Sequence, residues 1–261
     1  MSRLLGLGLV SISALGCMDT VEDVGEVDEG SAAQEAAPAG LLPDMRTVVP
    51  RHLAIQKQGG VETIRFSNGV ANTGEGPLRL RPENIGNITN AWQEILNADG
   101  SIASEHLAST FEFHPQHNHW HIDNIALYEV RAIKPDGPLW GSAIKTTFCL
   151  IDWYKLDGNN QGRVYWDCAT SYQGISPNWV DQYHHSLAGQ EVVVTGAPPG
   201  TYFLVSTANP SGAFVETTTN NNTAWTSFEL SRNKNGVPSI VVTGNSPCEN
   251  PGMCGEFAPN R

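Results

Sequence analysis

Short apolar runs alternate with turn-forming residues along the chain from Leu41 onward. The runs are rich in β-branched and aromatic residues, which favour strands, and helical periodicity is weak. Clusters of Pro, Gly, Asn and Asp, such as Asn97–Gly100 and Pro198–Gly200, separate the runs. The expected strands are Thr63–Phe66, Ile125–Ala132, Thr146–Ile151, Glu191–Thr195, Thr201–Thr207, Thr223–Leu230 and Ser239–Val242. This spacing predicts an all-β fold, a single β-sandwich-like domain over residues 41–261 with long loops. The irregular stretch Val180–Gly189 is expected to be one such loop.

The pattern at the N-terminus is different. Arg3 precedes the apolar run Leu4–Leu15, which is too short to span a bilayer and is typical of an export signal. The run ends in Ala14-Leu15-Gly16-Cys17, which resembles the lipobox of bacterial lipoproteins. Residues 1–17 are therefore expected to be a signal peptide with Cys17 as the lipidation site, and the protein to be a cell-envelope lipoprotein or secreted. A lipid on Cys17 would be its membrane attachment. An ordinary signal peptide with an incidental Cys17 is the alternative.

Residues 18–40 are rich in Asp, Glu, Ala and Gly and contain no Lys or Arg. Such a segment cannot bury enough apolar surface to order itself, so an acidic disordered linker is expected. It holds seven of the acidic residues, more than half of the formal net charge of −12. The remaining residues carry no basic stripe that could neutralise phosphates, which argues against nucleic acid as a partner.

Four cysteines besides Cys17 suit an exported protein with two disulfides. Cys248 and Cys254 flank a short loop and are expected to pair locally, which would leave Cys149 with Cys168. Three connectivities are open to four cysteines, so this pairing is a hypothesis. A thiolate metal site is disfavoured because no two cysteines have CxxC spacing.

Half of the eight histidines fall within the segment Phe111–His121. On a strand, alternate side chains share a face, so His117, His119 and His121 can point the same way. A straight strand would leave the outer two Cβ atoms roughly 13 Å apart, so a bend or bulge is required for them to share one ion. Imidazole groups in this number favour Cu(II), Zn or Ni. His114 does not follow the alternation of these three histidines, so it is kept as a supporting or additional ligand. A polar strand face is the alternative.

The segment Phe111–His121 resembles the copper-binding motif of the lysyl oxidase family. Further blocks that resemble the family follow in the same order, so that the resemblance covers about Leu41 to Leu230. These blocks are Ala143–Asp152, Tyr172–Pro177, Trp179–Tyr183, Pro199–Leu204, Asn209-Pro210, Glu216 and Asn220–Asn222. Gln116 and Trp179 stand where the animal enzymes have disulfide cysteines, so the disulfide pattern of this chain is reduced.

The resemblance implies a cofactor built from the chain itself. Lys145 takes the place of the family's cofactor lysine, four residues before Cys149, and Tyr183 takes the place of the cofactor tyrosine. In the family, copper and O₂ convert such a pair into lysine tyrosylquinone. The expected metal ligands are His117, His119 and His121, and the expected catalytic residues are Lys145 and Tyr183. Asp181, His184 and His185 are candidates for the base that removes a substrate proton.

The function implied is that of a copper-dependent amine oxidase of the protein-lysine 6-oxidase type. It would convert primary amines, including lysine side chains of proteins, to aldehydes and would release ammonia and hydrogen peroxide. A non-catalytic β-sandwich of the adhesion type that binds copper or zinc is one alternative. A zinc hydrolase that uses the three histidines is another, and a degenerate oxidase that keeps copper without forming the quinone is a third.

Overall fold

The computed structural model describes residues 39–84, 88–115, 118–143, 148–156, 162–168 and 172–255. The strands in these residues form antiparallel β-sheets. None of the described segments is a helix, so the all-β prediction is confirmed. The described residues contain no helix that is long and apolar enough to cross a membrane.

The first sheet is organised around one long strand, β3 (Val61–Asn72). Its first half pairs with β2 (Arg51–Gln58) and β13 (Glu191–Val193), and its second half with β1 (Met45–Thr47) and β12 (Trp179–Tyr183). The short strand β10 (Tyr154–Lys155) extends the sheet beyond β12. β3 is the central strand of this sheet because β1, β2, β12 and β13 all pair with it, and most of its side chains are buried.

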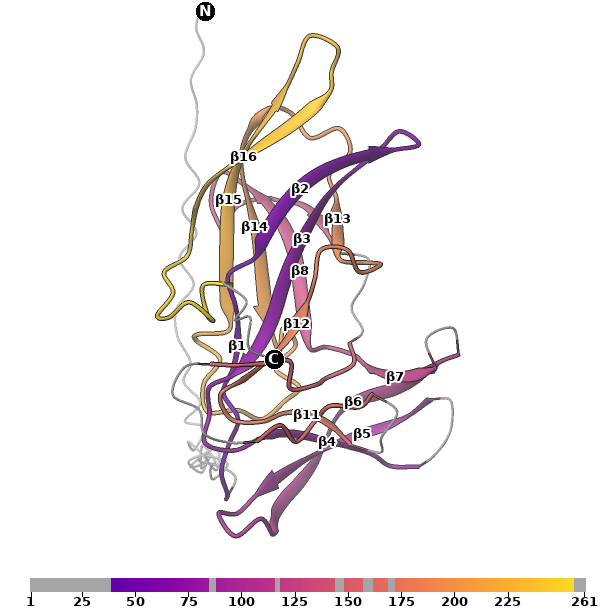
Figure 1. Ribbon diagram of the computed structural model, residues 1–261, viewed down its shortest axis with the longest axis vertical. Coiled ribbons are helices and arrows are strands. Elements are labelled where there is room, and N and C mark those ends of the chain that lie inside the picture. The colour runs from indigo at the N-terminus through magenta and orange to yellow at the C-terminus, as the bar shows by residue number, and fades with distance from the viewer. Residues whose placement is uncertain are drawn as a thin grey trace, which may run out of the picture. The chain divides into compact units, whose positions relative to one another are not determined.

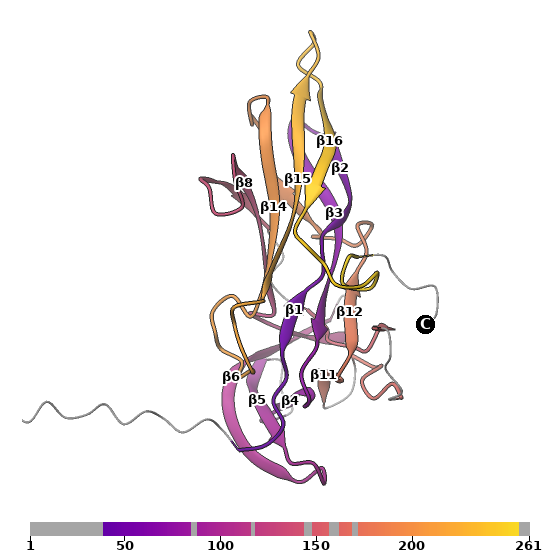
Figure 2. The ribbon, with the colours of Figure 1, turned by 90° about the vertical axis from the view of Figure 1, so that its left-hand side faces the viewer.

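The other two sheets have five strands each among the described residues (Figures 1 and 2). The second sheet has the order β11 (Gln173–Ile175), β4 (Leu78–Pro82), β5 (Ile88–Leu96), β6 (Ile102–His114) and β7 (His119–Ile122). The third has the order β16 (Pro238–Asn245), β15 (Thr223–Arg232), β14 (Gly200–Ala208), β8 (Ala126–Ala132) and β9 (Leu139–Ser142).

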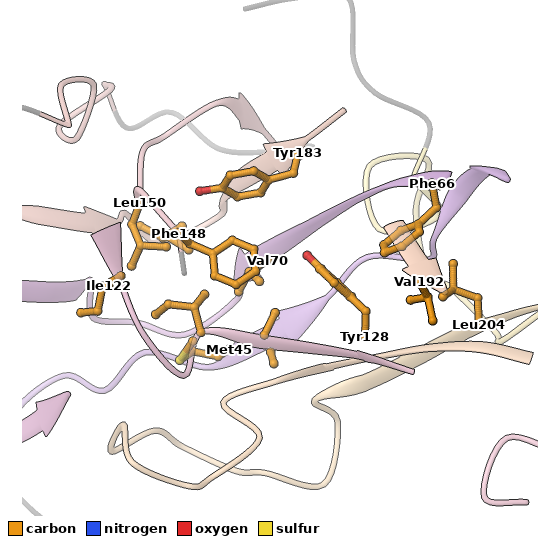
Figure 3. Close-up of a cluster of buried hydrophobic side chains, with 14 of the residues drawn as sticks. Met45, Phe66, Val70, Ile122, Tyr128, Phe148, Leu150, Tyr183, Val192 and Leu204 are labelled. Atoms are coloured by element: carbon orange, nitrogen blue, oxygen red, sulfur yellow. The ribbon is translucent and has the colours of Figure 1, made fainter. Parts of the chain in front are cut away.

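The first and third sheets pack face to face through large buried side chains. Phe66 of β3 meets Tyr128 of β8 edge to face, with ring centres 4.8 Å apart. The same apolar cluster continues to the second sheet through Ile122 and Phe148. Figure 3 shows Ile122 and Leu150 at one end of this cluster, Phe66 and Leu204 at the other, and Tyr183 and Phe148 between them. The core therefore reaches from the sandwich to the residues that the sequence singled out.

Six of the seven expected strands are present: Thr63–Phe66 within β3, and the others as β8, β13, β14, β15 and β16. The expected strand Thr146–Ile151 is wrong in its described part, because residues 148–151 form only an isolated bridge between Phe148 and Ile122. Phe148 and Leu150 are fully buried in the main hydrophobic cluster, so the apolar pattern here reflects burial rather than strand pairing. The expected loop Val180–Gly189 begins as strand β12 and becomes irregular only from His184.

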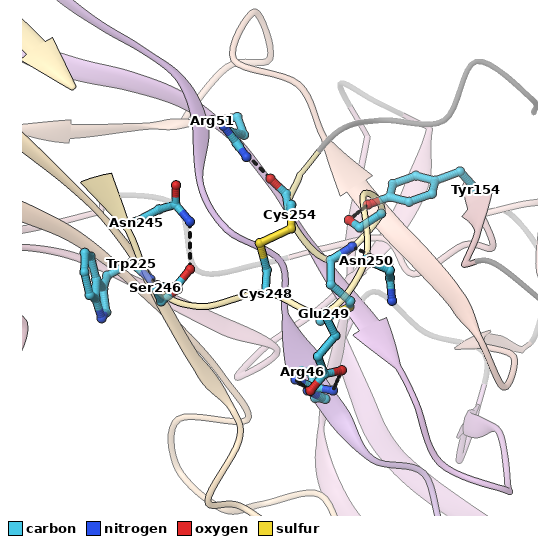
Figure 4. Close-up of a disulfide and its surroundings, with 12 residues drawn as sticks. Arg46, Arg51, Tyr154, Trp225, Asn245, Ser246, Cys248, Glu249, Asn250 and Cys254 are labelled. Atoms are coloured by element: carbon cyan, nitrogen blue, oxygen red, sulfur yellow. Dashed lines mark hydrogen bonds and ion pairs between the residues drawn. A yellow bond between two sulfur atoms is a disulfide. The ribbon is translucent and has the colours of Figure 1, made fainter. Parts of the chain in front are cut away.

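Both expected disulfides are present, Cys149–Cys168 and Cys248–Cys254. The second closes the loop that follows β16 and is held against the first sheet (Figure 4). Arg51 donates from Nε to the Cys254 carbonyl at 2.5 Å, and the Tyr154 hydroxyl donates to the Gly252 carbonyl at 2.8 Å. These bonds fix the end of the described chain to β2 and β10.

Candidate metal and cofactor site

The described parts of the histidine-rich segment belong to two paired antiparallel strands rather than to one continuous strand. β6 ends at His114, β7 begins at His119, and these two residues face each other in the strand register. Asn118 has a positive φ of 55°, a conformation that asparagine tolerates better than most residues in tight turns. Only His119 and His121 therefore share a strand among the described histidines of the motif, and the chain reverses its direction between His114 and His119.

His119 and His121 point the same way from β7, and their Nε2 atoms are 2.8 Å apart. An imidazole nitrogen binds Cu(II) or Zn²⁺ at about 2.0 Å, so two such nitrogens lie about 2.8 Å apart at the right angles of a tetragonal Cu(II) site and about 3.3 Å apart around a tetrahedral Zn²⁺. The observed separation thus fits two adjacent positions of a tetragonal copper site better than a tetrahedral zinc site. The same contact is also a hydrogen bond when one ring donates and the other accepts.

The ring of His114 lies beside that of His121, with ring centres 4.1 Å apart. No three His, Cys, Asp or Glu side chains within the described ranges form a group that would hold a metal ion. The described part of the motif therefore brings two imidazole nitrogens together, those of His119 and His121. His117, the third ligand expected from the sequence, lies outside the described residues, as do Lys145 and Cys17.

Tyr183 is the last residue of β12 and is 8% exposed. Its hydroxyl donates to the Cys149 carbonyl at 2.5 Å, and its ring packs edge to face on Phe148 with centres 5.0 Å apart. β12 can approach β3 closely because Gly69 has no side chain. A Cβ on that residue would lie 2.7 Å from the Asp181 carbonyl oxygen. The sequence of β3 thus contributes to the position of Tyr183.

Asp181 lies two residues before Tyr183 on the same face of β12 and is 1% exposed. Burial raises the pKa of Tyr183 well above its usual value, and the negative charge of Asp181 raises it further, while the hydrogen bond to Cys149 acts in the opposite direction. The phenol is therefore held in its neutral, protonated form next to a buried carboxyl group.

A cavity of about 640 Å³ brings these groups together. His119, His121, Asp181 and Tyr183 line it, and His184 lies at its edge on the loop after β12. Much of the remaining lining is apolar and comes from Ile151, Trp153, Leu187 and Ala188. The site thus combines imidazoles, a phenol and a carboxyl group in an apolar setting, which is typical of an enzyme cavity.

The third candidate base, His185, lies with its ring beside those of His52 and His184, with ring centres 5.7 and 4.0 Å away. The main-chain amide of His185 donates to the Ser67 hydroxyl at 2.9 Å, and its carbonyl accepts a bond from Arg65 Nε at 2.7 Å. His185 is not among the described residues of the cavity wall. Of the three base candidates, Asp181 and His184 therefore face the cavity, and only Asp181 is buried there.

Two features of the site were not identified from the sequence. Cys149 and Cys168 both line the cavity, so the disulfide forms part of its wall. The buried side chain of Gln173 bonds to the main chain of Trp120 and of Leu150, on two sides of the site. Gln173 lies in a sequence block that resembles the family. Neither the glutamine itself nor its position relative to the histidines indicated this role from the sequence.

Comparison with known proteins decides the family. The model of the family described as lysyl oxidase matches residues 93–237, which is more than half of the 261 residues. The chain belongs to the lysyl oxidase family. The matched stretch contains both histidines of β7, Asp181, Tyr183 and the disulfide of the cavity wall.

Curated relatives agree with this assignment at low identity. Lysyl oxidase homolog 2 of Rattus norvegicus is 25% identical over 219 residues, which is 80% of this chain and 24% of the relative. Lysyl oxidase homolog 2 of Homo sapiens is 26% identical over 161 residues, which is 61% of this chain and 17% of the relative. The chain thus spans about a quarter or less of the length of these relatives.

Proposed function

We propose that this lysyl oxidase family member is a copper-dependent amine oxidase. It converts primary amines, including lysine side chains of proteins, to aldehydes: each amine consumes one O₂ and one water and yields one aldehyde, one ammonia and one hydrogen peroxide. The observation that carries the proposal is that the paired imidazoles of His119 and His121 and the buried phenol of Tyr183 line one cavity.

His117, His119 and His121 would hold the copper ion, and Lys145 and Tyr183 would form lysine tyrosylquinone. Copper and the quinone together would supply the redox chemistry, accepting electrons from the amine and passing them to O₂. The fit of the donors to this metal rests on the 2.8 Å separation of the two described Nε2 atoms. The short bond from Tyr183 to the Cys149 carbonyl fixes the phenol ring at the cavity wall.

Asp181 is the residue we assign to proton removal from the substrate carbon. It lies on the same strand face as Tyr183 and lines the cavity, so its carboxylate can reach a substrate bound at the cofactor position. His184, on the exposed loop, is placed to contact the part of the substrate that extends to solvent.

The apolar lining has two roles in this proposal. Ile151 and Trp153, which are half-buried, limit the access of water to the reacting groups, and together with the exposed Leu187 they offer contacts to the hydrocarbon stem of an amine. A lysine side chain is such a stem, with a terminal amine and four methylene groups. A free alkylamine presents the same groups without the peptide.

The protein is proposed to act outside the cytoplasm. Two disulfides are typical of an oxidising compartment. Residues 1–17 would direct export, Cys17 would carry a lipid anchor, and the acidic residues 18–40 would connect this anchor to the catalytic domain of residues 41–261.

The test is an oxidase assay on the full chain, produced for export in copper-containing medium. The proposal expects amine-dependent release of hydrogen peroxide and one reactive carbonyl per chain, measured with phenylhydrazine. Tyr183→Phe is expected to abolish both signals. Tyr154→Phe is a matched control because Tyr154 is also a buried phenol that donates to a main-chain carbonyl, that of Gly252.

Copper binding without peroxide release or a reactive carbonyl would contradict the oxidase proposal. It would favour instead a non-catalytic surface protein that binds copper or zinc. The paired Nε2 atoms of His119 and His121 are compatible with that alternative, since binding a metal requires neither Lys145 nor Tyr183.

A further inference from the structure

Gln173 has a fully buried side chain whose amide bonds in two directions. It is 1% exposed. Its Oε1 accepts the main-chain N–H of Leu150 at 2.9 Å, and its Nε2 donates to the main-chain carbonyl of Trp120 at 2.8 Å. Both bonds have good lengths. The Leu150 amide is fully buried, so losing its bond would leave a buried main-chain N–H without its partner, whereas the Trp120 carbonyl is half-buried.

The two partners of Gln173 belong to the two halves of the site. Trp120 lies between His119 and His121 on β7, so its carbonyl belongs to the strand that carries the imidazole pair. Leu150 directly follows Cys149, whose carbonyl accepts the bond from the Tyr183 hydroxyl. One glutamine side chain therefore links the main chain at the metal ligands to the main chain that holds the cofactor tyrosine.

This link requires the second sheet to curl. Gln173 lies on β11 and Trp120 on β7, which are the two outermost strands of the five-stranded order. Strands lie about 4.8 Å apart, so the edges of a flat sheet of five would be about 19 Å apart, which is more than a glutamine can span. Register shifts in the pairing of β5 with β6 supply the bending. The side chain of Gln173 thus closes the gap between the two edges.

A second link lies beside the first. The main-chain N–H of Trp120 donates to the Cys168 carbonyl at 3.3 Å, and Cys168 is joined to Cys149 by the disulfide. The two main-chain groups of Trp120 are therefore both held from the same side, one by Gln173 and one by the disulfide-linked segment. A shift of β7 relative to Cys149 would break both.

We propose that Gln173 is a positioning residue that sets the place of the imidazole pair relative to Tyr183. The inference rests on the proposed function, since it concerns how copper and the cofactor tyrosine are brought together. Gln173 itself does not line the cavity among the described residues. It acts through the main chain of β7 and of Leu150. Groups that orient metal ligands from outside typically change metal affinity by 10- to 100-fold when removed.

A purely structural role for Gln173 would affect stability without affecting copper affinity. The chain provides a matched control for this distinction. Gln93 is also fully buried and makes two bonds to main chain: Nε2 donates to the Val215 carbonyl at 2.8 Å, and Oε1 accepts the Val215 N–H at 2.9 Å. Neither Gln93 nor Val215 lines the cavity. Methionine at either position keeps the approximate length of the side chain and removes both bonds.

The experiment compares the full chain with its Gln173→Met and Gln93→Met variants in three measurements. The first is the free energy of unfolding, and the second is the copper dissociation constant, measured against a competing chelator. The third is the hydrogen exchange of peptides that contain Trp120 and Leu150. We expect comparable stability losses in both variants. We expect the dissociation constant to rise about 10- to 100-fold in Gln173→Met only, with faster exchange at Trp120 and Leu150.

Equal copper affinity in the two variants would overturn the positioning role. If Gln173→Met fails to fold, Gln173→Glu replaces it: it keeps an acceptor for Leu150, loses the donor to Trp120 when ionised, and is expected to weaken copper binding as well. If the unaltered chain does not bind copper, the proposed function fails. Hydrogen exchange then decides separately whether Gln173 holds β7 to Leu150, and unchanged exchange in the variant overturns that link too.

Discussion

The hydroxyl of Tyr183 donates to the main-chain carbonyl of Cys149 at 2.5 Å, and Cys149 is joined to Cys168 through the disulfide in the cavity wall. The acceptor that holds the phenol is therefore part of a cross-linked segment. Because the Cys168 carbonyl also accepts the N–H of Trp120, this disulfide connects the tyrosine to the strand that carries the imidazole pair.

Removing the two disulfides separately is expected to give different results. Cys149→Ala/Cys168→Ala opens a link across a sequence separation of 19 and Cys248→Ala/Cys254→Ala one across 6. Loop-closure entropy predicts losses of about 3 and about 2 kcal/mol, measured by urea unfolding. Phenylhydrazine-reactive carbonyl should fall only in the first variant, because only that disulfide lines the cavity. Equal carbonyl yields in both variants would contradict a positioning effect of Cys149.

Asp181→Asn is expected to lower the kcat of amine oxidation by about 10²- to 10⁴-fold, the usual contribution of a general base. Copper content should be unchanged, because Asp181 is not an assigned ligand. Asp152→Asn is the control: Asp152 is also fully buried, but it accepts bonds from the amides of Val164, Tyr165 and Ser176 and is not among the described lining residues. This variant should lose stability while its folded fraction keeps its kcat. A normal kcat in Asp181→Asn would remove Asp181 as the base.

Arg65 holds the loop that forms one side of the cavity. Its guanidinium donates to the carbonyls of His185 and Leu187 at 2.7 and 2.5 Å and pairs with Glu191. Arg65→Lys cannot make all of these bonds, because an ammonium group lacks the planar fork of donors. The expected result is a higher KM for amines with kcat nearly unchanged, since in the proposed function Leu187 would contact the substrate without taking part in proton transfer. Steady-state kinetics would show a fall in kcat alone if this assignment is wrong.

The ion pair between Glu62 and Arg232 predicts a dependence of stability on pH. The hydrogen bond from Arg232 lowers the pKa of Glu62 from its ordinary value of 4.5 to about 2. A lowered pKa in the folded state means that the stabilisation is fully present above about pH 4.5 and is lost as the pH falls towards 2. The difference in unfolding free energy between the native chain and Glu62→Gln should therefore shrink over this range. A difference that stays constant from pH 5 to 2 would contradict the assignment.

The sequence predicted the strands whose patterns are simple. Thr201–Thr207 and Thr223–Leu230 pair with each other inside β14 and β15, and both are rich in β-branched and aromatic residues. β2 was missed because it carries polar residues such as His52, Gln56 and Lys57, and much of it is exposed. Strands at the edge of a sheet often have such polar patterns, which obscure the strand period.

The site was predictable only where it depends on local spacing. The separation of His119 and His121 by two residues places both rings on one face of a strand, as the sequence indicated. The link from Gln173 to Trp120 was not predictable, because it exists only once the second sheet has curled. The burial of Asp181 beside Tyr183 likewise depends on the close approach of β12 to Gly69.

The most direct measurement is a search, by mass spectrometry of a digest of the copper-loaded chain, for a covalent link between the peptides that contain Lys145 and Tyr183. The amine oxidase proposal predicts one cross-linked peptide, which is absent from the Tyr183→Phe variant and present in Tyr154→Phe. Recovery of both peptides unmodified from copper-loaded protein would contradict the quinone cofactor and with it the proposed chemistry.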